Sequence, residues 1–547
     1  METQPKNQYL KRNKWSYSLG GIGRDMTYTL VATFFMTYIQ YAGLGLTVAQ
    51  FSAIGVMLVI GRVWDAINDP MMGAIIENTK SPWGKFKPWI LIGAVLTAIV
   101  IVMMFNIRPL GHNGWDFVVF FGVIYLAWEI AFTMNDISYW SMLPSLSTNP
   151  KHRNSITTMA VVFAGVGAFA ANAMATFMTV GNAVAGYRAV SIIIAVALVL
   201  CQVLTVFGVK EPEIKDEIHK DKVSLKKMFK VIVHNDQLLW LILAMLLYNV
   251  GSGILVALGY NFFFMELGYD RFQVVIFIVV FGVSNLSIQA FYPIIVKKLG
   301  RKRLMWVSMI ILGLGYLLLL LMGYVSILPI NLIVICLFGF LVFTGQALFY
   351  MVLTVNIANT IEYNEYKTGE RNEGIIFSLR PFMAKMASAL EQGIMTLVLV
   401  TSGIFVLSQN VSELERQKEI YDNLETAEQA TYKANALAEI VIFEGEEYAE
   451  LTAETKQTFY EMLQLVEYET EDGKEIMIIT ATADQYFRDR ATPVMRIYLR
   501  LAITLVPAIT IVASWLILRK KFIIDEEMYN MMISEIKNRK ATPEAVN

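Results

Sequence analysis

The sequence predicts an all-α membrane protein with twelve transmembrane helices in two six-helix bundles. Hydrophobic residues make up 56% of the 547 residues, and charged residues make up only 17%, whereas a soluble domain is about a quarter charged. The mean hydropathy of +0.51 agrees with this. Apolar runs of about 20 residues, which cross a bilayer as helices, recur twelve times, at residues 27–46, 51–76, 88–107, 116–144, 156–180, 187–208, 237–265, 272–296, 304–324, 328–358, 375–408 and 493–518.

The composition of these runs favours helices, because none shows the alternating pattern of a barrel strand and a helix satisfies its own backbone in hydrocarbon. A charged linker and two similar basic turns, "SPWGKFKP" after the second span and "KKLGRKR" after the eighth, indicate a duplicated chain. We therefore expect the following parts: an N-terminal bundle at 1–208, a cytoplasmic linker at 209–235, helices seven to eleven at 236–408, an insertion at 409–492, helix twelve at 493–518 and a tail at 519–547.

The distribution of lysine and arginine predicts the orientation. These residues gather in the even-numbered connections and in both tails, which places both termini in the cytoplasm. The opening residues "METQPKNQYLKRNKWS" lack the apolar core of a cleaved signal. Cys201 and Cys336 lie in separate spans and predict no disulfide. We expect a multi-pass protein of the cell membrane, in a bacterium the inner membrane.

Residues 409–492 depart from the pattern of spans. They contain 20 acidic and 7 basic residues, a net charge of −13, in periodic stretches such as "LERQKEIYDNLETAEQATYKANALAEI". This pattern predicts soluble helices, and the topology places them outside the cytoplasm. A solvated helical cap is the preferred interpretation, and a docking or substrate-collecting role is the alternative.

Charged residues within or beside the spans mark the candidate functional region, because an ionised side chain in a bilayer is costly and usually faces a cavity. Six acids and four bases leave the interior short of about two positive charges, a deficit that a bound cation or protonated carboxyls would remove. These ten residues are Arg24, Asp25, Arg62, Asp65, Asp69, Glu129, Asp136, Arg380, Lys385 and Glu391.

Helical spacing predicts a cation site on the second and fourth spans. Asp65, Asn68 and Asp69 share one helix face, because residues three and four apart are neighbours. A stripe on the fourth span includes Thr133 and Asp136. Carboxylate, amide and hydroxyl oxygens suit a hard cation, and sodium is its expected occupant. The alternative is that these acids pair with arginine or lysine and only hold helices together.

Three segments carry a resemblance to a known family. "RVWDAINDPMMGAIIENTKSPWGKFKPWILIG", "FTMNDISYWSMLP" and "EYNEYKTGERNEGIIFSLRPFMAKMASAL" resemble the signatures of the glycoside-pentoside-hexuronide:cation symporters, typified by the melibiose permease, within the major facilitator superfamily. The resemblance extends from about residue 15 to 520, apart from the insertion. It implies a transporter rather than an enzyme, with no cofactor beyond a coupling sodium ion or proton, that takes up a sugar or glycoside by alternating access.

The resemblance also implies roles for individual residues. Asp65, Asn68, Asp69 and Thr133 match the family's cation-binding positions, and Lys385 matches a lysine whose ammonium pairs with the carboxylates when the ion is absent.

The substrate positions follow in the same way. Asp25 and Asp136 match two carboxylates that accept hydrogen bonds from sugar hydroxyls, and Trp140 matches an aromatic side chain that lies against the sugar ring. Arg24 stands where the family has another base and is expected to donate to Asp25. Tyr350 stands where an aromatic wall is expected, although core packing is an equal alternative for it.

One departure bears on the substrate. The family pattern has an arginine on the fifth span, where this chain has Val161. We hypothesise that Arg380 replaces it and binds an anionic substrate such as a hexuronide. The alternative is that Arg380 pairs internally with Glu129, Asp136 or Glu391.

The sequence is also compatible with two other functions: a proton-coupled symporter or exchanger, and a transporter-like receptor that binds a glycoside without moving it. The expected partners are a small sugar, a coupling cation and membrane lipid. No nucleic-acid partner is expected, and nothing in the sequence demands more than a monomer.

Overall fold

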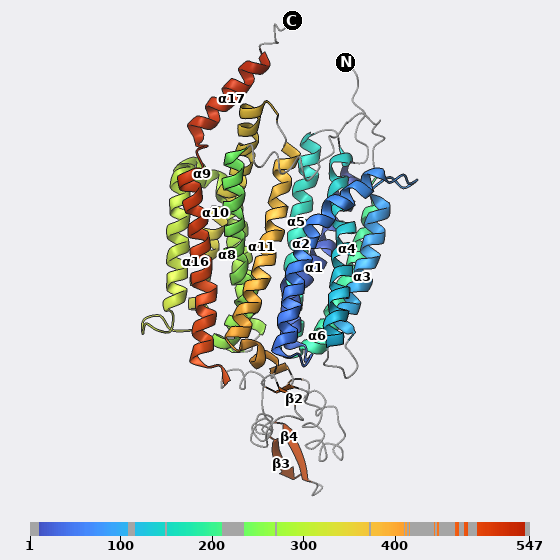
Figure 1. The fold of residues 1–547 in the computed structure, drawn as a ribbon, viewed down its shortest axis with the longest axis vertical. Helices are drawn as coiled ribbons and strands as arrows, with labels where there is room; N and C mark the ends of the chain where they lie inside the picture. Colours follow the sequence, from blue (N-terminus) through green and yellow to red (C-terminus); the bar gives the residue numbers. More distant parts are fainter. Residues whose placement is uncertain are drawn as a thin grey trace. The chain divides into compact units, whose positions relative to one another are not determined.

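In a computed structural model, helices make up nearly all of the secondary structure of the described residues. The residues that the structure describes are 10–107, 115–147, 150–210, 235–268, 271–370, 373–409, 411–412, 415, 442–443, 446–447, 465–469, 475–479 and 490–541. The helices drawn in Figure 1 are α1 Leu10–Tyr41, α2 Val48–Asn78, α3 Lys87–Asn106, α4 Trp115–Met142, the short 3-10 helix η1 Leu143–Leu146, α5 Pro150–Thr179, α6 Ala183–Gly208, α8 Asp236–Leu267, α9 Arg271–Leu321, α10 Leu332–Thr368, α11 Glu373–Thr401, α16 Pro493–Lys521 and α17 Glu526–Ala541.

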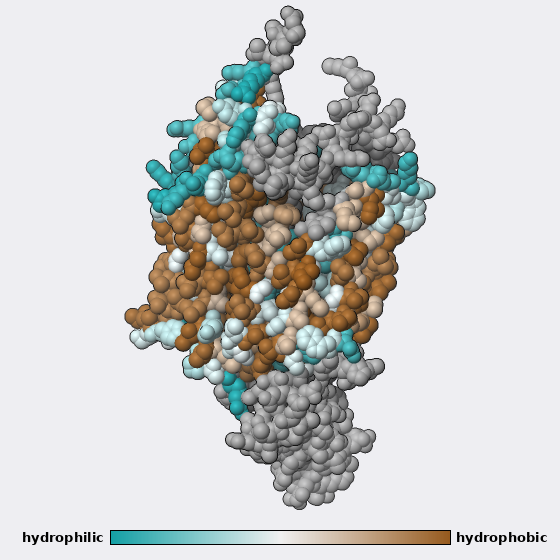
Figure 2. Space-filling model, viewed as in Figure 1, coloured by the Kyte–Doolittle hydropathy of each residue, from teal (hydrophilic) through white to brown (hydrophobic). Residues whose placement is uncertain are grey.

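The prediction of a helical, multi-pass membrane protein is confirmed. Among the described residues, ten helices are long and apolar enough to cross a membrane. The two other predicted spans correspond to α1, which is too polar to meet that criterion, and to the shorter apolar segment Phe272–Asn285. Figure 2 shows hydrophobic residues over most of the visible sides of the helices, as expected for surfaces that face lipid.

The first helix differs from its prediction. It begins at Leu10 and ends at Tyr41, whereas the apolar run predicted 27–46. The helix ends early because Gly43 and Gly45 take positive φ angles of 59° and 62°, which turn the chain. The Thr47 side chain then caps α2 by accepting from the Gln50 backbone at 3.2 Å.

Helix α9 joins two of the predicted spans. It runs from Arg271 to Leu321 but contains a break at Gly300, whose φ of 70° is not helical. The break falls between the predicted spans 272–296 and 304–324, within the basic turn "KKLGRKR". Glycine allows this turn because it has no Cβ to oppose a positive φ.

The chain divides into two compact units. The first comprises Met1–Glu217, Tyr260–Val275 and Thr396–Tyr498, and the second comprises Ile218–Gly259, Ile276–Met395 and Leu499–Asn547. Within the first unit, α1 packs against α5 and α6, α3 packs against α4 and α6, and α2 packs against α4. These contacts place α4, the predicted carrier of both sites, beside α2.

Close helix contacts in the first unit depend on glycine. A Cβ at Gly23 of α1 would overlap the backbone of α6 at Ala197 and Leu198, and a Cβ at Gly167 of α5 would overlap Ile22 of α1. The two glycines therefore let α1 approach both neighbours at backbone distance. This approach brings the charged middle of α1 into the interior.

The insertion contains strands where helices were predicted. Strand β1 Ile442–Phe443 pairs with β2 Glu446–Glu447, and β3 Leu465–Glu469 pairs antiparallel with β4 Glu475–Ile479. The helical prediction is wrong for these segments. Their sequence shows the reason: "VEYE" alternates apolar and acidic residues, "EIMII" is a short apolar run rich in β-branched isoleucine, and the Asp472-Gly473 pair between them is a typical hairpin signal. Most of the stretch quoted above, 414–440, lies outside the described residues.

Helix α17 follows the last span and was not predicted. It packs on the end of α10, where Met532 and Ile524 join Tyr363 in a buried apolar cluster. Arg539 donates to the backbone oxygen of Tyr366 at 2.9 Å. In Figure 2 the surface of α17 is mostly hydrophilic, which agrees with a position outside the spans.

Candidate functional site

The first polar cluster joins α1 to α4 through Arg24. This arginine is only 5% exposed, and its guanidinium forms ion pairs with Asp25 on its own helix and with Asp136 on α4. The two carboxylate side chains are 22% and 21% exposed. Arg24 therefore holds the buried sides of two carboxylates whose other sides stay accessible.

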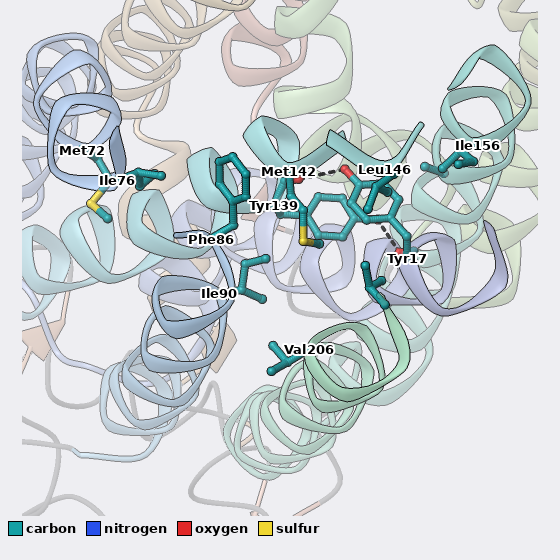
Figure 3. Packing of buried hydrophobic residues seen from close by; sticks show 12 residues of the cluster. Tyr17, Met72, Ile76, Phe86, Ile90, Tyr139, Met142, Leu146, Ile156 and Val206 are labelled. Carbon is teal, nitrogen blue, oxygen red and sulfur yellow. Dashed lines mark hydrogen bonds between the residues drawn. The ribbon is translucent and has the colours of Figure 1, made fainter. Parts of the chain in front are cut away.

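Aromatic rings line the same guanidinium. Its Cζ lies 4.7 Å from the ring centroid of Trp140 and 5.1 Å from that of Tyr139, within the range of a cation–π contact. Tyr139 in turn stacks on Tyr17 at 4.2 Å. The Tyr17 hydroxyl donates to the Tyr139 backbone oxygen at 2.9 Å, and the Tyr139 hydroxyl donates to the Tyr17 backbone oxygen at 2.7 Å (Figure 3). This reciprocal pair fixes α1 against α4 next to Arg24.

The second cluster joins α2 to α4 through Thr133. Its hydroxyl donates to Oδ1 of Asp65 at 3.0 Å and lies 3.5 Å from Oδ1 of Asp69. Asp65, Asn68 and Thr133 are buried, and Asp69 is half-buried. The spacing in the sequence predicted that these residues share helix faces, and the structure shows that the two faces meet.

Asn68 adds a polar side chain whose amide nitrogen has no hydrogen-bond partner. This atom, Nδ2, is buried, and a buried polar group normally has a hydrogen-bond partner. Because the oxygen and nitrogen of an amide exchange places on rotation by 180°, the same side chain can present an acceptor oxygen. Asp65, Asp69, Thr133 and Asn68 together thus form a donor set that fits a hard cation such as sodium.

A third buried cluster lies one turn away on the same two helices. Arg62 of α2 and Glu129 of α4 approach to 3.5 Å between Nη1 and Oε1, and both side chains are 2% exposed. The guanidinium lies 5.6 Å from the Trp128 ring and 5.9 Å from the Tyr28 ring. The sequence placed these two charges in the interior without joining them. Glu129 lies one turn before Thr133, and that spacing was the signal that could have identified the pair.

The second unit holds the remaining candidates. Arg380 donates through Nη2 to the Tyr350 hydroxyl at 2.6 Å, and its Cζ lies 5.5 Å from the Tyr350 ring centroid. Tyr350 also stacks on Tyr248 at 5.7 Å. The structure therefore brings together the predicted Tyr350 and Arg380, with Tyr350 as the hydrogen-bond partner of Arg380. Lys385 is half-buried further along α11, and its coupling role stays a prediction.

The fold and these clusters define a class of protein: a polytopic membrane protein of the transporter type, with desolvated charges on its helices. Residues 16–429 match the family described as MFS/sugar transport protein, and the chain belongs to this family. The resemblance predicted from three sequence segments is thereby confirmed. The family consists of membrane transport proteins rather than enzymes.

Similar proteins include the lactose permease of Leuconostoc lactis, 30% identical over 422 residues, which cover 73% of this chain and 64% of the permease. The raffinose carrier protein of Pediococcus pentosaceus is 27% identical over 71% of this chain and 62% of the carrier. The chain thus spans less than two thirds of the length of these two relatives. The glucuronide carrier protein homolog of Escherichia coli is 25% identical over 73% of this chain and 85% of that protein.

Solved structures agree on the fold alone. A bacterial homolog to the human lysosomal transporter Spinster aligns with a TM-score of 0.55 at 11% identity, over 99% of this chain and all of that one. The nucleoside transporter NupG aligns with a TM-score of 0.51 at 12% identity, over 74% of this chain and 97% of that one. The major facilitator fold predicted from the sequence is consistent with these neighbours.

Proposed function

We propose that the chain is a secondary active transporter that moves a sugar, glycoside or hexuronide together with sodium by alternating access. The single observation that carries this proposal is the position of the Thr133 hydroxyl on the carboxylates of Asp65 and Asp69. Thr133 precedes Asp136, which Arg24 holds, by three residues on α4. One turn of one helix therefore separates the proposed cation site from the proposed substrate site.

This arrangement supplies a physical route for coupling. A cation drawn to Asp65 and Asp69 engages the Thr133 oxygen and holds that turn of α4 against α2. Since neighbouring turns of a helix move together, the bound cation also restrains Asp136. The ordering cost at Asp136 is then met before the sugar arrives, which raises sugar affinity, and by reciprocity the sugar raises cation affinity.

The proposed substrate contacts follow from the chemistry of the Arg24 cluster. A sugar presents hydroxyl donors and an apolar ring face. The accessible carboxylate oxygens of Asp25 and Asp136 accept hydrogen bonds from the hydroxyls, and the half-buried Trp140 ring lies against the ring face. The names of the similar proteins, lactose permease, raffinose carrier and glucuronide carrier, support a glycoside as the substrate class.

An anionic glycoside has a further proposed contact. Arg380 is exposed and carries a hydrogen bond to the neutral Tyr350 hydroxyl. A carboxylate of a hexuronide can form the stronger, charge-assisted pair with this guanidinium. We place the protein in the inner membrane of a bacterium, with both termini in the cytoplasm, as a monomer surrounded by lipid.

Counterflow in proteoliposomes tests the function. The full chain is reconstituted, and uptake of lactose, raffinose and a glucuronide is measured with a sodium gradient, with a pH gradient and with neither. We expect sodium to accelerate uptake of at least one glycoside, and Asp65→Asn to abolish that acceleration. Val119→Ala is a matched control, because Val119 lies on α4 but is 60% exposed on its outer face.

The outcomes separate the alternatives. If only the pH gradient accelerates uptake, the coupling ion is a proton rather than sodium. Saturable glycoside binding without uptake would identify a receptor. Absence of both binding and uptake for the whole glycoside panel would reject the proposed substrate class.

A further inference from the structure

We propose that Gln409 is a positioning residue for alternating access: its side chain caps the end of α1 and stabilises the state in which that end of the first unit is closed. This inference rests on the proposed function, since a transporter needs the same end to open. Gln409 follows α11 in the chain and is only 5% exposed. The sequence alone predicted no role for it.

The argument begins with the last turn of α1. A helix leaves its last four backbone oxygens without partners inside the helix, and α1 ends at Tyr41. The amide nitrogen of Gln409, Nε2, donates to the backbone oxygen of Ile39 at 3.0 Å and to that of Gln40 at 2.6 Å. One side chain from a distant part of the chain therefore satisfies two of these oxygens.

The same side chain holds the turn that follows α1. Its Oε1 accepts from the backbone N–H of the buried Leu46 at 3.3 Å. Three residues after Gln409, the Ser412 hydroxyl accepts from the backbone N–H of Gly43 at 2.9 Å. Because a buried backbone group without a partner is costly, Gln409 and Ser412 together fix the path of the chain between α1 and α2.

The segment that carries Gln409 also contacts the start of α2. Phe405 stacks on Phe51 of α2 with the ring centroids 4.0 Å apart, and both rings are buried. The hydrogen bonds of Gln409 thus lie beside apolar packing that excludes water. A hydrogen bond in such surroundings is stronger than one exposed to solvent.

Helix α8 covers the same end of α1. Thr37 of α1 is buried and lines a cavity of only about 10 Å³ together with Tyr260 of α8. The Tyr260 hydroxyl lies 2.8 Å from the hydroxyl of Thr176 on α5, and the Tyr41 hydroxyl donates to Oδ1 of Asn261 on α8 at 2.9 Å. These residues all belong to the first compact unit.

Alternating access requires these contacts to separate. Both α8 and α11 begin in the second unit and end in the first, so a motion of the two units against each other acts on their ends. Gln409 contacts α1 through its side chain, and its hydrogen bonds can break without unwinding of a helix. Loss of one such bond shifts an equilibrium about fivefold. Gln409 therefore adjusts the balance between the closed and the open state of this end.

Cysteine labelling tests the proposal on the full chain in bacterial cells. Cys201 and Cys336 are replaced by serine, and Thr37→Cys is the reporter for a membrane-impermeant maleimide added outside. Gln409→Met keeps the length of the side chain and removes its three hydrogen bonds, so we expect labelling at least about tenfold faster. Thr401→Val is the matched control, because Thr401 is exposed and its hydroxyl donates within its own helix. It should change the rate by less than about twofold.

A second reporter separates opening from a general loosening of the fold. Ser308→Cys lies on α9 in the second unit, where Ser308 is fully buried. A merely structural role for Gln409 predicts that Gln409→Met speeds labelling of both reporters, whereas opening speeds labelling of Thr37→Cys alone. Ser412→Ala removes one hydrogen bond to the turn and should produce a smaller increase, about fivefold.

Each result either supports or overturns the inference. Unchanged labelling of Thr37→Cys in Gln409→Met, or an equal increase at Ser308→Cys, would overturn it. If Gln409→Met does not fold, Ser412→Ala decides by the same comparison of the two reporters. Labelling needs neither sugar nor sodium. Wild-type protein that neither binds nor moves a glycoside therefore rejects the proposed function, and wild-type transport with unchanged labelling in Gln409→Met rejects this inference alone.

Discussion

Arg24 and Arg62 lie in two charge clusters of the same unit. The two clusters contain the same kinds of residues, but the acids that pair with the arginines differ in exposure. Each arginine is buried, each contacts two aromatic rings, and each pairs with an acid on α4. Arg24, however, holds two carboxylates that are about one fifth exposed, with side-chain values of 22% and 21%. Arg62 faces a carboxylate that is 2% exposed.

Under the proposed function, this difference in exposure is why the Arg24 cluster binds the sugar and the Arg62–Glu129 pair does not. Carboxylates with an accessible side can exchange water for a sugar hydroxyl while the arginine keeps them in place. A carboxylate sealed on all sides has no such exchange available, and its charge acts only on its neighbours. Exposure of the acid, rather than the presence of a buried arginine, therefore distinguishes the proposed substrate region around Arg24 from the Arg62–Glu129 pair.

The largest effect is expected for Arg24→Gln. This change leaves Asp25 and Asp136 near each other without their shared base, and loss of one partner from a buried ion pair costs about 3–5 kcal/mol. We expect glycoside affinity, measured by equilibrium binding, to fall at least about a hundredfold. Arg24→Lys keeps the positive charge but lacks the planar guanidinium that contacts both carboxylates. Its glycoside affinity should therefore lie between those of wild type and Arg24→Gln. Wild-type affinity in Arg24→Gln would show that the two regions do not differ as described.

Thr133→Val tests the hydrogen bond that the Thr133 hydroxyl on α4 donates to Asp65 on α2. Valine has nearly the shape of threonine but lacks the hydroxyl, and a hydrogen bond to a charged group contributes about 1.5–3 kcal/mol. Calorimetry should show sodium affinity lowered at least about tenfold, with glycoside affinity unchanged when sodium is absent. Thr133→Ser, which restores the oxygen, is the matched control. Equal losses of sodium and glycoside affinity in Thr133→Val would mean that packing, and not ligation, is disturbed.

A smaller effect is expected for Tyr17→Phe. The substitution removes one of the two reciprocal hydrogen bonds between α1 and α4 and keeps the stacked ring. A single such bond contributes about 1 kcal/mol, so glycoside binding should weaken about fivefold, with sodium affinity unaltered. A parallel loss of sodium affinity would show that Tyr17 supports both regions rather than the Arg24 cluster alone.

The smallest effect concerns an ion pair outside the spans, which serves as an exposed reference. Lys302 lies 3.1 Å from Asp525, ahead of α17. The backbone N–H of Met528 and the Lys302 ammonium hold the pKa of the Asp525 carboxyl below its ordinary value. Its contribution to α17 docking is therefore fully present above the unfolded pKa of about 3.9 and is lost as the pH falls through the lower, folded pKa.

Hydrogen exchange of the α17 amides between pH 6 and pH 3, corrected for the intrinsic rate, measures this contribution. Wild type should lose protection slightly as the pH falls, whereas Asp525→Asn should begin less protected and show no such step. An identical pH profile in the two proteins would contradict the assignment. A small change agrees with the weak coupling of exposed ion pairs.

Much of the fold followed from local patterns. The helical spans were predicted because hydrophobicity and length are properties of a single segment. The errors have local causes too: Gly43 and Gly45 end α1 before its apolar run stops. An Asp-Gly turn between two segments rich in β-forming residues gives strands β3 and β4 inside a segment expected to be helical. Helix α17 was missed because it is polar and lies beyond the last span.

The candidate site was predicted only in part. Asp65 and Asp69 were expected on one helix face because residues four apart on a helix are neighbours in any fold, and both approach Thr133; the place of Asn68 in a cation site stays a prediction. The contact of Arg24 with its neighbour Asp25 was predicted and is confirmed. The pairings of Arg24 with Asp136 and of Arg62 with Glu129 could not be chosen from the sequence, since each arginine had several acids on other helices within its possible reach. The Tyr17 and Tyr139 pair was missed because its hydrogen bonds join residues 122 positions apart.

The sequence by itself determined that the chain enters a membrane, roughly where most helices lie, and which polar residues share a helix face. These properties depend on interactions between residues a few positions apart. The tertiary structure decided which acid compensates which arginine and which carboxylates keep an accessible side. Those properties depend on distances between helices and on burial, and both are set only when α4 packs against α2 and meets α1.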